Sequence, residues 1–242
     1  MESFMLIGPE GTIECLVHPS KNKQALLLMA HGFRGSREGG GRAAALAEHL
    51  STLVTVVRFN FHGSQILSRQ VGELRAVLQK LRQRYPQQKL FLLGRSLGGA
   101  ASIIASEQES LAGLILWSTP NNLRATFRQA LGEEQYQRLN QGQVLSLEDE
   151  RGKLDLLPQF LSDFDQYNLG KLLARRSCPL LLLHGAEDEV VLVEQARKNF
   201  AMAAEPKELR IYPGADHSLG ACQPAVEENI RQWLKAHLPS GK

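Results

Sequence analysis

Residues 90–99 read Leu-Phe-Leu-Leu-Gly-Arg-Ser-Leu-Gly-Gly, and this stretch decides the fold class. Its apolar run Leu90–Leu93 is typical of a strand that is buried on both faces of a sheet. The small residues of Leu97–Ser106 predict a helix that can pack closely against its neighbours. The Gly-x-Ser-x-Gly pattern between them predicts a tight strand-to-helix turn that lifts the hydroxyl of Ser96 out of the sheet.

On both sides of this turn, short apolar runs alternate with amphipathic helical stretches. This alternation predicts an α/β fold with a doubly wound, mostly parallel sheet that is covered by helices on both faces. The predicted strands are Gly11–His18 at an edge, Gln24–Ala30, Leu53–Phe59, Lys89–Leu93, Leu111–Trp117, Pro179–Leu183 and Lys207–Tyr212. The predicted helices are Gly41–Ser51, Gln70–Tyr85, Leu97–Ser106, Glu194–Ala204 and Ala225–His237.

The segment 121–178 is too long for a simple connection, so we expect it to have structure of its own. Residues 123–139 show helical apolar spacing, residues 144–156 predict a hairpin with a polar turn, and the apolar-rich stretch Leu157–Tyr167 follows. We therefore predict an α/β core made of residues 1–120 and 179–242, with residues 121–178 as a small lid inserted after the sixth core strand.

Length and composition exclude several classes of protein. The chain has 242 residues, which suits one α/β domain with a core that needs no disulfides, and its net charge of +3 is too small to make nucleic acid or an anionic membrane the main partner. Cys15, Cys178 and Cys222 are too few for a disulfide framework and lack metal-ligand spacing. We see no signal-peptide pattern and no apolar run long enough to span a membrane, so we expect a cytoplasmic protein. The oligomeric state is not readable from the sequence.

Ser96 is the candidate nucleophile, although a glycine-rich turn that contains a serine by chance would show the same pattern. A serine hydroxyl is a poor nucleophile until a base takes its proton. In the chain order Ser…Asp/Glu…His, the base follows the last strand, and there His217 lies just after Lys207–Tyr212. His217 is therefore the candidate base, the alternative being an ordinary surface histidine.

The base needs a carboxylate that fixes its tautomer and stabilises the imidazolium. Asp188, in the loop after the apolar run Leu180–Leu183, is the natural candidate. Glu187 and Glu189 flank it and keep the assignment open, and all three could equally be a solvated acidic loop. Asp216 is poorly placed to reach the ring of its sequence neighbour.

An oxyanion hole requires backbone N–H groups directed at one oxygen. One donor is expected to be the N–H of Leu97, the residue after the nucleophile. The second is expected in the loop after Gln24–Ala30, where we assign the N–H of Phe33, although a plain glycine-containing turn would have the same sequence.

These features, in this order along the chain, resemble those of α/β-hydrolase-fold serine hydrolases over nearly the whole length. Within that fold, the segments His31–Phe33, His184–Asp188 and Ala215–His217 most resemble the cinnamoyl/feruloyl esterase-like and monoglyceride-lipase-like group. The resemblance implies a compact lid after strand six and the following site residues: the nucleophile Ser96, the acid Asp188, the base His217 and the oxyanion donors Phe33 and Leu97.

The sequence departs from this group at two places. Asn60 stands where related sequences usually have Asp, and the glycine-rich stretch after it is shortened. Arg95, directly before the nucleophile, is less usual there than an aromatic residue or histidine. We expect Arg95 either to join a structural ion pair or to place positive charge at the rim of the site.

We expect a serine hydrolase that cleaves carboxylic esters of small or medium acyl groups through a Ser-His-Asp triad and an acyl-enzyme, with no metal or organic cofactor. The same triad would also serve an acyl thioesterase, a lipid esterase or a small-peptide hydrolase, and a non-catalytic binding module is a third class. The predicted substrate pocket is lined by Trp117 and by three lid residues that could equally be packing residues of the lid, Phe160, Phe164 and Tyr167. Residues 238–242 are predicted to be a frayed end.

Overall fold

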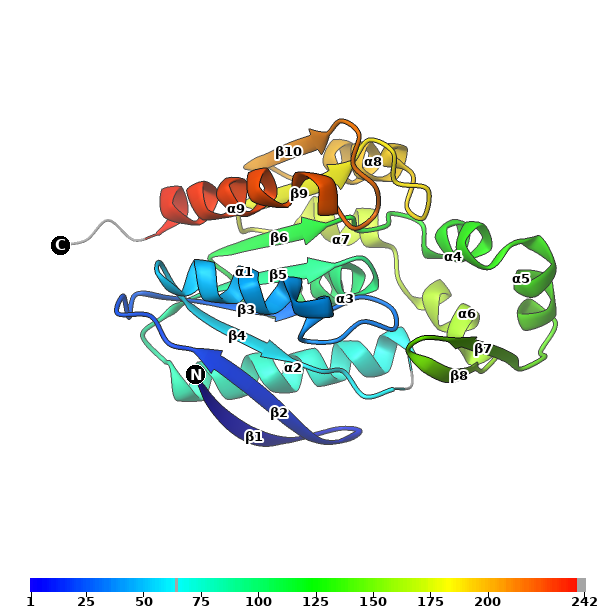
Figure 1. Cartoon of the computed structure of the whole chain (residues 1–242), viewed down its shortest axis with the longest axis horizontal. Coiled ribbons are helices and arrows are strands. Elements are labelled where there is room, and N and C mark those ends of the chain that lie inside the picture. The colour runs from blue at the N-terminus through cyan, green and yellow to red at the C-terminus, as the bar shows by residue number, and fades with distance from the viewer. Residues whose placement is uncertain (64, 239–242) are drawn as a thin grey trace.

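The computed structural model describes residues 1–63 and 65–238, and its centre is an eight-stranded sheet (Figure 1). The strand order is β1-β2-β4-β3-β5-β6-β9-β10. The pairs β1–β2 and β2–β4 are antiparallel, and all other neighbouring pairs are parallel. The strands are β1 (Glu2–Gly8), β2 (Gly11–His18), β3 (Ala25–Ala30), β4 (Thr55–Phe59), β5 (Lys89–Arg95), β6 (Gly113–Trp117), β9 (Leu180–Gly185) and β10 (Lys207–Tyr212). The predicted fold class is confirmed, whereas the predicted frayed end falls on residues 239–242, outside the described residues.

Helices cover both faces of this sheet (Figure 1). One face carries α1 (Arg42–Ser51) and α9 (Gln223–His237), with the short turns η1 (Gly39–Gly41) and η3 (Gly220–Cys222) before them. The other face carries α2 (Leu67–Arg84), α3 (Leu97–Ser106), α7 (Leu169–Arg175) and α8 (Val193–Met202).

Successive residues of a strand point to opposite faces, so each central strand contributes to both apolar cores. Along β6, Leu114 and Leu116 pack under the α2/α3 layer, while Ile115 and Trp117 face α1 and α9. A strand that is buried on both sides in this way is mostly apolar, which is why the short apolar runs located these strands correctly.

Two local predictions need correction. The edge of the sheet is β1, which the sequence reading left out, and β2 lies inside it. Residues 4–7 of β1 are all apolar, but only Leu6 is buried, and Met5 and Ile7 are exposed. The predicted helix over 123–139 is broken at Gly132, where a φ of 79° ends α4 (Leu123–Leu131) and starts α5 (Glu133–Asn140).

Most of the lid segment, defined as residues 121–178, stands together beyond the ends of the parallel strands (Figure 1). It holds α4, α5, the hairpin β7 (Leu145–Asp149) and β8 (Gly152–Leu156), α6 (Gln159–Asp163) and η2 (Phe164–Gln166). The carboxylate of Asp163 accepts hydrogen bonds of 2.7 Å from both the N–H and the hydroxyl of Ser68, at the start of α2. Its last helix, α7, packs against α3 and α8 on the sheet.

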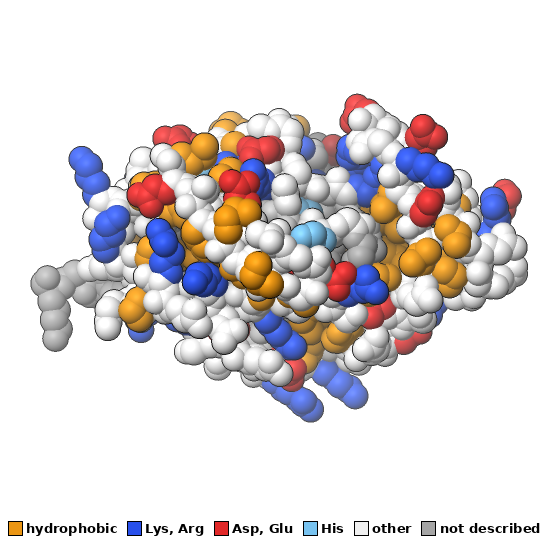
Figure 2. All heavy atoms as spheres, turned by 90° about the horizontal axis from the view of Figure 1, so that it is seen from below, with side chains coloured by type: hydrophobic (Ala, Val, Ile, Leu, Met, Phe, Trp, Pro, Cys, Tyr) orange, Lys and Arg blue, Asp and Glu red, His pale blue; other side chains and the backbone are white. Residues whose placement is uncertain are grey.

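Figure 2 shows one face of the molecule, on which basic, acidic and apolar side chains are interspersed. No stripe of a single charge runs across the part of this face that is coloured by side-chain type. Within residues 1–63 and 65–238, no helix combines the length and the apolar character that a bilayer crossing requires.

Candidate active site

Ser96 lies on a strained turn between β5 and α3. Its φ of 52° and ψ of −122° put a residue with a side chain in a region of backbone space that strongly favours glycine. The turn is held by backbone hydrogen bonds, because Ser96 N–H donates to the carbonyl of Trp117 at 2.8 Å and its carbonyl accepts from Gly99 N–H at 2.9 Å. The predicted strand-turn-helix context is therefore present, and the serine sits at the N-terminal end of a ten-residue helix.

The glycines around Ser96 are required by close approaches of the backbone. A Cβ on Gly94 would lie 2.6 Å from the carbonyl oxygen of Gly98, and one on Gly98 would lie 2.7 Å from that of Ala30. A Cβ on Gly32 would lie 3.0 Å from Cβ of Ser96. The end of β3 therefore packs directly on the nucleophile turn, and side chains at these glycines would push the two apart.

The two predicted oxyanion donors lie on either side of this contact. Leu97 is the first residue of α3, where N–H groups have no partner within the helix. Phe33 follows Gly32 in a tight turn that is closed by a 2.9 Å hydrogen bond from Gly35 N–H to the Gly32 carbonyl. Both backbone positions therefore border the serine, one through the chain and one through Gly32.

His31 holds the Phe33 turn in place. Its Nδ1 lies 2.9 Å from the carbonyl of Gly32 and its Nε2 lies 3.0 Å from Phe61 N, so Nδ1–H donates and Nε2 accepts. Burial lowers the pKa of His31, while the hydrogen bond to Gly32 acts in the opposite direction. A neutral ring is the form that can make both bonds at once.

Asp188 and His217 form a hydrogen-bonded pair. Nδ1 of His217 lies 2.8 Å from Oδ2 of Asp188, whose residue is only 3% exposed. The other carboxylate oxygen, Oδ1, accepts from the N–H groups of Val190 at 3.0 Å and Val191 at 2.8 Å. The backbone thus fixes Oδ1 of the carboxylate, while Oδ2 accepts the hydrogen bond from His217.

His184 supports the same carboxylate from β9. Its Nε2 lies 2.7 Å from the carbonyl of Val191 and 3.3 Å from Oδ2 of Asp188, so one N–H can serve both oxygens. Burial alone would raise the pKa of Asp188, but hydrogen bonds from His184 and His217, the charge of His217 and the N–H of Val191 together hold that pKa well below its usual range. Asp188 is therefore ionised and ready to stabilise a protonated His217.

The competing carboxylates point elsewhere. Glu187 and Glu189 are exposed, and the carboxylate of Asp216 accepts from the N–H and hydroxyl of Ser218 at 2.9 and 2.7 Å. The two loops that carry Asp188 and His217 are joined by a 3.0 Å hydrogen bond from Glu187 N–H to the carbonyl of Ala215. The structure places Asp188, and none of its acidic neighbours, against His217.

Ser96, Asp188 and His217 follow the C-terminal ends of the parallel strands β5, β9 and β10 respectively, at one edge of the sheet. Within the described residues, Asp188–His217 is present as a hydrogen bond and no hydrogen bond joins His217 to Ser96. Such bonds are commonly long in unliganded sites and shorten when substrate binds.

The four residues that were predicted to line the substrate pocket lie in different surroundings. Trp117 faces α1 and α9, because residues alternate along β6 and Leu116 takes the position on the other face. Phe160 is fully buried and Phe164 nearly so, while Tyr167 lines a groove at the base of the lid segment that Phe164 also borders.

The buried lid aromatics meet the Phe33 turn. The ring centroid of Phe33 lies 5.2 Å from that of Phe127 and 5.6 Å from that of Phe160, and Phe127 lies 4.7 Å from Phe160. Next to them Arg34 reaches the β7–β8 hairpin, with Nη2 2.7 Å from Oδ1 of Asp149. The lid segment therefore contacts the predicted oxyanion turn directly.

Sequence reasoning did not assign His31 and His184 a role, although both were quoted in the loops that matter. Each stands at the end of an apolar run and is followed by glycine: Leu26–Ala30 precedes His31-Gly32, and Leu180–Leu183 precedes His184-Gly185. That repeated pattern was the available signal. For the part of the chain that is described, no cluster of three or more His, Cys, Asp or Glu side chains is arranged to hold a metal ion.

A sequence model of the prolyl oligopeptidase family matches residues 68–241, a range that includes Ser96, Asp188 and His217. The chain belongs to the prolyl oligopeptidase family. Among curated proteins there is no match.

Several solved structures share the fold of this chain. Est1E from Butyrivibrio proteoclasticus, with ferulic acid bound, has a TM-score of 0.80 and 17% identity, covering 97% of this chain and 98% of its own. An esterase domain of a Rhodothermus marinus protein has a TM-score of 0.75 and 23% identity, covering 96% of both chains. An alpha-beta serine hydrolase homologue from Coxiella burnetii has a TM-score of 0.68 and 22% identity, covering 96% of this chain and 97% of its own. The protein is thus an α/β-hydrolase-fold serine hydrolase, as its motifs predicted.

Proposed function

We propose that this serine hydrolase is a carboxylesterase that cleaves esters of small or medium acyl groups through Ser96, His217 and Asp188. The observation that carries the proposal is the position of Ser96 on a strained turn at the sheet edge where a buried, ionised Asp188 holds His217. Esterases among the structures of similar fold support the choice of an ester as substrate.

The proposed reaction has two stages. In the first, Nε2 of His217 takes the proton of the Ser96 hydroxyl as its oxygen attacks the ester carbonyl, and the tetrahedral oxyanion accepts N–H bonds from Phe33 and Leu97. His217 then gives the proton to the departing alcohol, which leaves an acyl-Ser96. In the second stage His217 takes a proton from water, the resulting attack releases the carboxylic acid, and the proton returns to Ser96.

Asp188 keeps His217 in the tautomer that this chemistry needs. Because its Oδ2 accepts from Nδ1–H of His217, Nε2 is left free to accept the serine proton. The same contact stabilises the imidazolium formed in each stage.

A small-peptide hydrolase is the second candidate, and the family match is the observation that favours it. The triad and oxyanion donors would serve amide cleavage equally well, and the difference would lie in the pocket. An acyl thioesterase and a lipid esterase use the same residues but have no separate observation in their favour.

The test is a substrate panel with p-nitrophenyl esters of increasing acyl length, an acyl-CoA and an aminoacyl anilide. We expect turnover of the shorter esters, and a fluorophosphonate probe should label Ser96. Ser96→Ala should lower kcat by about 10⁶-fold, because the members of a triad act as a unit, whereas Ser106→Ala, in the same helix, should leave it unchanged.

Other outcomes would decide against the esterase. Turnover confined to the anilide would favour the peptide hydrolase, and turnover confined to the acyl-CoA would favour a thioesterase. Absence of turnover with every substrate, together with no labelling of Ser96, would contradict the catalytic proposal and favour a non-catalytic binding module.

A further inference from the structure

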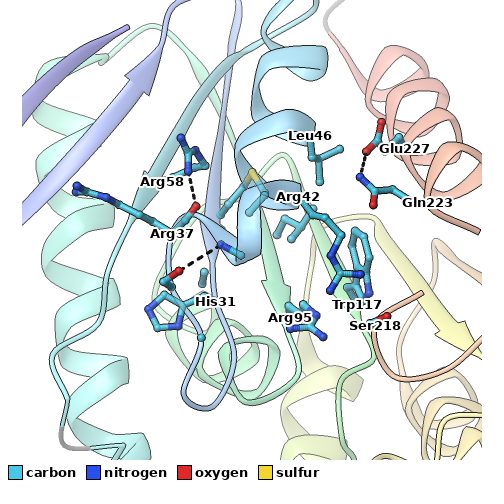
Figure 3. A pocket seen from close by; sticks show the side chains of 17 residues that line it. His31, Arg37, Arg42, Leu46, Arg58, Arg95, Trp117, Ser218, Gln223 and Glu227 are labelled. Atoms are coloured by element: carbon cyan, nitrogen blue, oxygen red, sulfur yellow. Dashed lines mark hydrogen bonds between the residues drawn. The ribbon is translucent and has the colours of Figure 1, made fainter. Parts of the chain in front are cut away.

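A hollow lies behind the catalytic turn, on the face of the sheet that α1 and α9 cover (Figure 3). Its cavity volume is about 90 Å³. Its walls come from the end of β3 and the loop after it, from β4, β5, β6, α1, the start of α9 and the loop after β10, and they do not include Ser96, Asp188 or His217. The mechanism proposed above makes no use of this space.

Two of the four arginines in its wall form no ion pair with any described residue. Arg37 pairs with Glu14 at 2.8 Å, and Arg58 pairs with Glu38 at 3.1 Å. The guanidinium groups of Arg42 and Arg95, by contrast, make no ion pair or hydrogen bond to any residue in 1–63 or 65–238. The first alternative for Arg95, a structural ion pair, is thus not what the described residues show.

Arg42 and Arg95 belong to one end of the hollow. Figure 3 shows both directed toward the side where Trp117 and Ser218 lie, away from His31 and Arg58. A Cβ on Gly220 would lie 3.0 Å from Nη1 of Arg42, which places that guanidinium against the loop after β10. Burial lowers the pKa of Arg95 and the charge of Arg42 lowers it further, while Asp188 and Asp216 act in the opposite direction.

An unpaired buried donor lies at the same end. Nε1 of Trp117 is inaccessible to solvent and has no hydrogen-bond partner among the described residues. A buried N–H without an acceptor costs free energy, and this one lies in a residue that lines the same end of the hollow as the two arginines. The carboxylate that does line the hollow, Glu227, accepts instead from Nε2 of Gln223 at 2.7 Å.

The wall of the hollow also contains apolar residues. Met29, Leu46 and Leu93 are buried residues that border it, together with Ala43 from α1. A cationic end beside an aliphatic wall is suited to a ligand that carries an anionic head and a short hydrocarbon tail. Inorganic phosphate would satisfy the arginines but leave the aliphatic wall in contact with water.

We propose that this hollow is a binding site for a small organic carboxylate with a short aliphatic tail, whose head is held by the guanidinium groups of Arg42 and Arg95. The site is separate from the catalytic one but adjoins it. Arg95 precedes Ser96, Ser218 follows His217, and the carbonyl of Trp117 accepts the N–H of Ser96.

The proposal is tested by titrating the full-length protein with sodium octanoate, octan-1-ol and inorganic phosphate. Calorimetry measures affinity, and tryptophan fluorescence reports on the site because Trp117 lines it. Octanoate has no scissile bond, so its binding is independent of whether the esterase proposal holds. We expect octanoate to bind more tightly than either of the other two probes.

Arginine variants assign that binding to the hollow. Arg42→Gln should weaken octanoate binding about 10- to 100-fold, the loss expected for a charge-assisted hydrogen bond, and Arg95→Gln should do the same. Arg69→Gln, an equal change of charge on the outer face of α2, is the matched control and should bind as the wild type does. Circular dichroism checks that each variant is folded. Arg42 is exposed, so the Arg42→Gln variant still tests the proposal if the variant of the more buried Arg95 does not fold.

Four results would overturn the proposal. They are absence of saturable octanoate binding at about 1 mM, equal binding of octanol, phosphate binding as tight as that of octanoate, and unchanged octanoate binding by Arg42→Gln. The last result would also place octanoate elsewhere, for example beside Ser96.

Discussion

The ends of β3 and β9 carry the same sequence pattern, an apolar run followed by His-Gly, yet the two histidines have different tasks. His31 bonds to backbone only, donating to Gly32 and accepting from Phe61 N–H, and so fixes the turn that presents Phe33. His184 donates toward Val191 and Asp188, and so supports a charged side chain as well as a loop. The same two residues can therefore organise an oxyanion turn or an acid loop, depending on which partner lies across the sheet edge.

The largest effect is expected at the carboxylate that His184 supports. Asp188→Asn should lower kcat on an ester substrate by about 10⁴-fold, because an amide cannot select the tautomer of His217 or stabilise its charged form. Glu187→Gln, an exposed neighbour, should change kcat little. Comparable losses in the two variants would remove Asp188 from the role that its 2.8 Å hydrogen bond to His217 supports.

The next effect tests the β3 end. His31→Phe removes both hydrogen bonds that hold the Phe33 turn, and kcat should fall about 10²- to 10³-fold, the loss associated with one oxyanion donor. KM should change much less, because the donor acts on the transition state. His49→Phe on the outer face of α1 is the control, and a rise in KM alone would show that His31 shapes ground-state binding instead.

A smaller effect on turnover is expected at the β9 end. His184→Gln leaves the two backbone N–H bonds to Asp188 Oδ1, so kcat should fall far less than in Asp188→Asn. The free energy of unfolding should drop by about 1–3 kcal/mol, because a buried hydrogen-bonding group loses its partner. Denaturant unfolding beside steady-state kinetics separates the two quantities. A loss of kcat as large as that of Asp188→Asn would mean that the two residues act as one unit.

The smallest effect is a difference in pH dependence. The pKa of His31 is lowered from its ordinary 6.5, so the stability contributed by the neutral ring is full above that pH and is lost as the pH falls below it. The lowered pKa of Asp188 works the same way in a more acidic window, with its contribution lost below the ordinary value of 3.8.

Thermal unfolding across these two windows is the measurement. The Tm advantage of the wild type over His31→Gln should shrink below pH 6.5, whereas its advantage over Asp188→Asn should persist there and shrink only near and below pH 3.8. Identical pH dependence for the two variants would contradict the assignment of the two windows.

The sequence was sufficient to predict most of the sheet and the positions of the catalytic candidates. Strands buried on both faces are mostly apolar, and the motif around Ser96 combines a run of this kind with glycines that the turn requires. The sequence reading missed β1, an edge strand in which residues 4–7 are all apolar but only Leu6 is buried. It also missed the break at Gly132, where helical spacing continues across a residue with positive φ.

Residue roles that depend on distant partners were beyond the sequence. His31 bonds to Phe61, 30 residues away, and Arg34 to Asp149, 115 residues away. The face of the sheet to which the side chain of Trp117 points depends on the register of β6, because a shift of one residue moves each side chain to the opposite face of the sheet. A pattern of residue types does not contain that register, so the sequence did not show that Trp117 faces α1 and α9, whereas the triad candidates fell at one edge of the sheet.

The bond from Arg34 to the β7–β8 hairpin has a consequence for engineering. Arg34 follows Phe33, and Phe33 itself packs on Phe127 and Phe160, so the oxyanion turn and the lid segment share their supports. A lid transplanted from a relative would have to bring a replacement for Asp149 and for both phenylalanines. Under the proposed mechanism, a change of the lid segment would therefore also disturb the turn that carries Phe33, and a designer would have to rebuild both together.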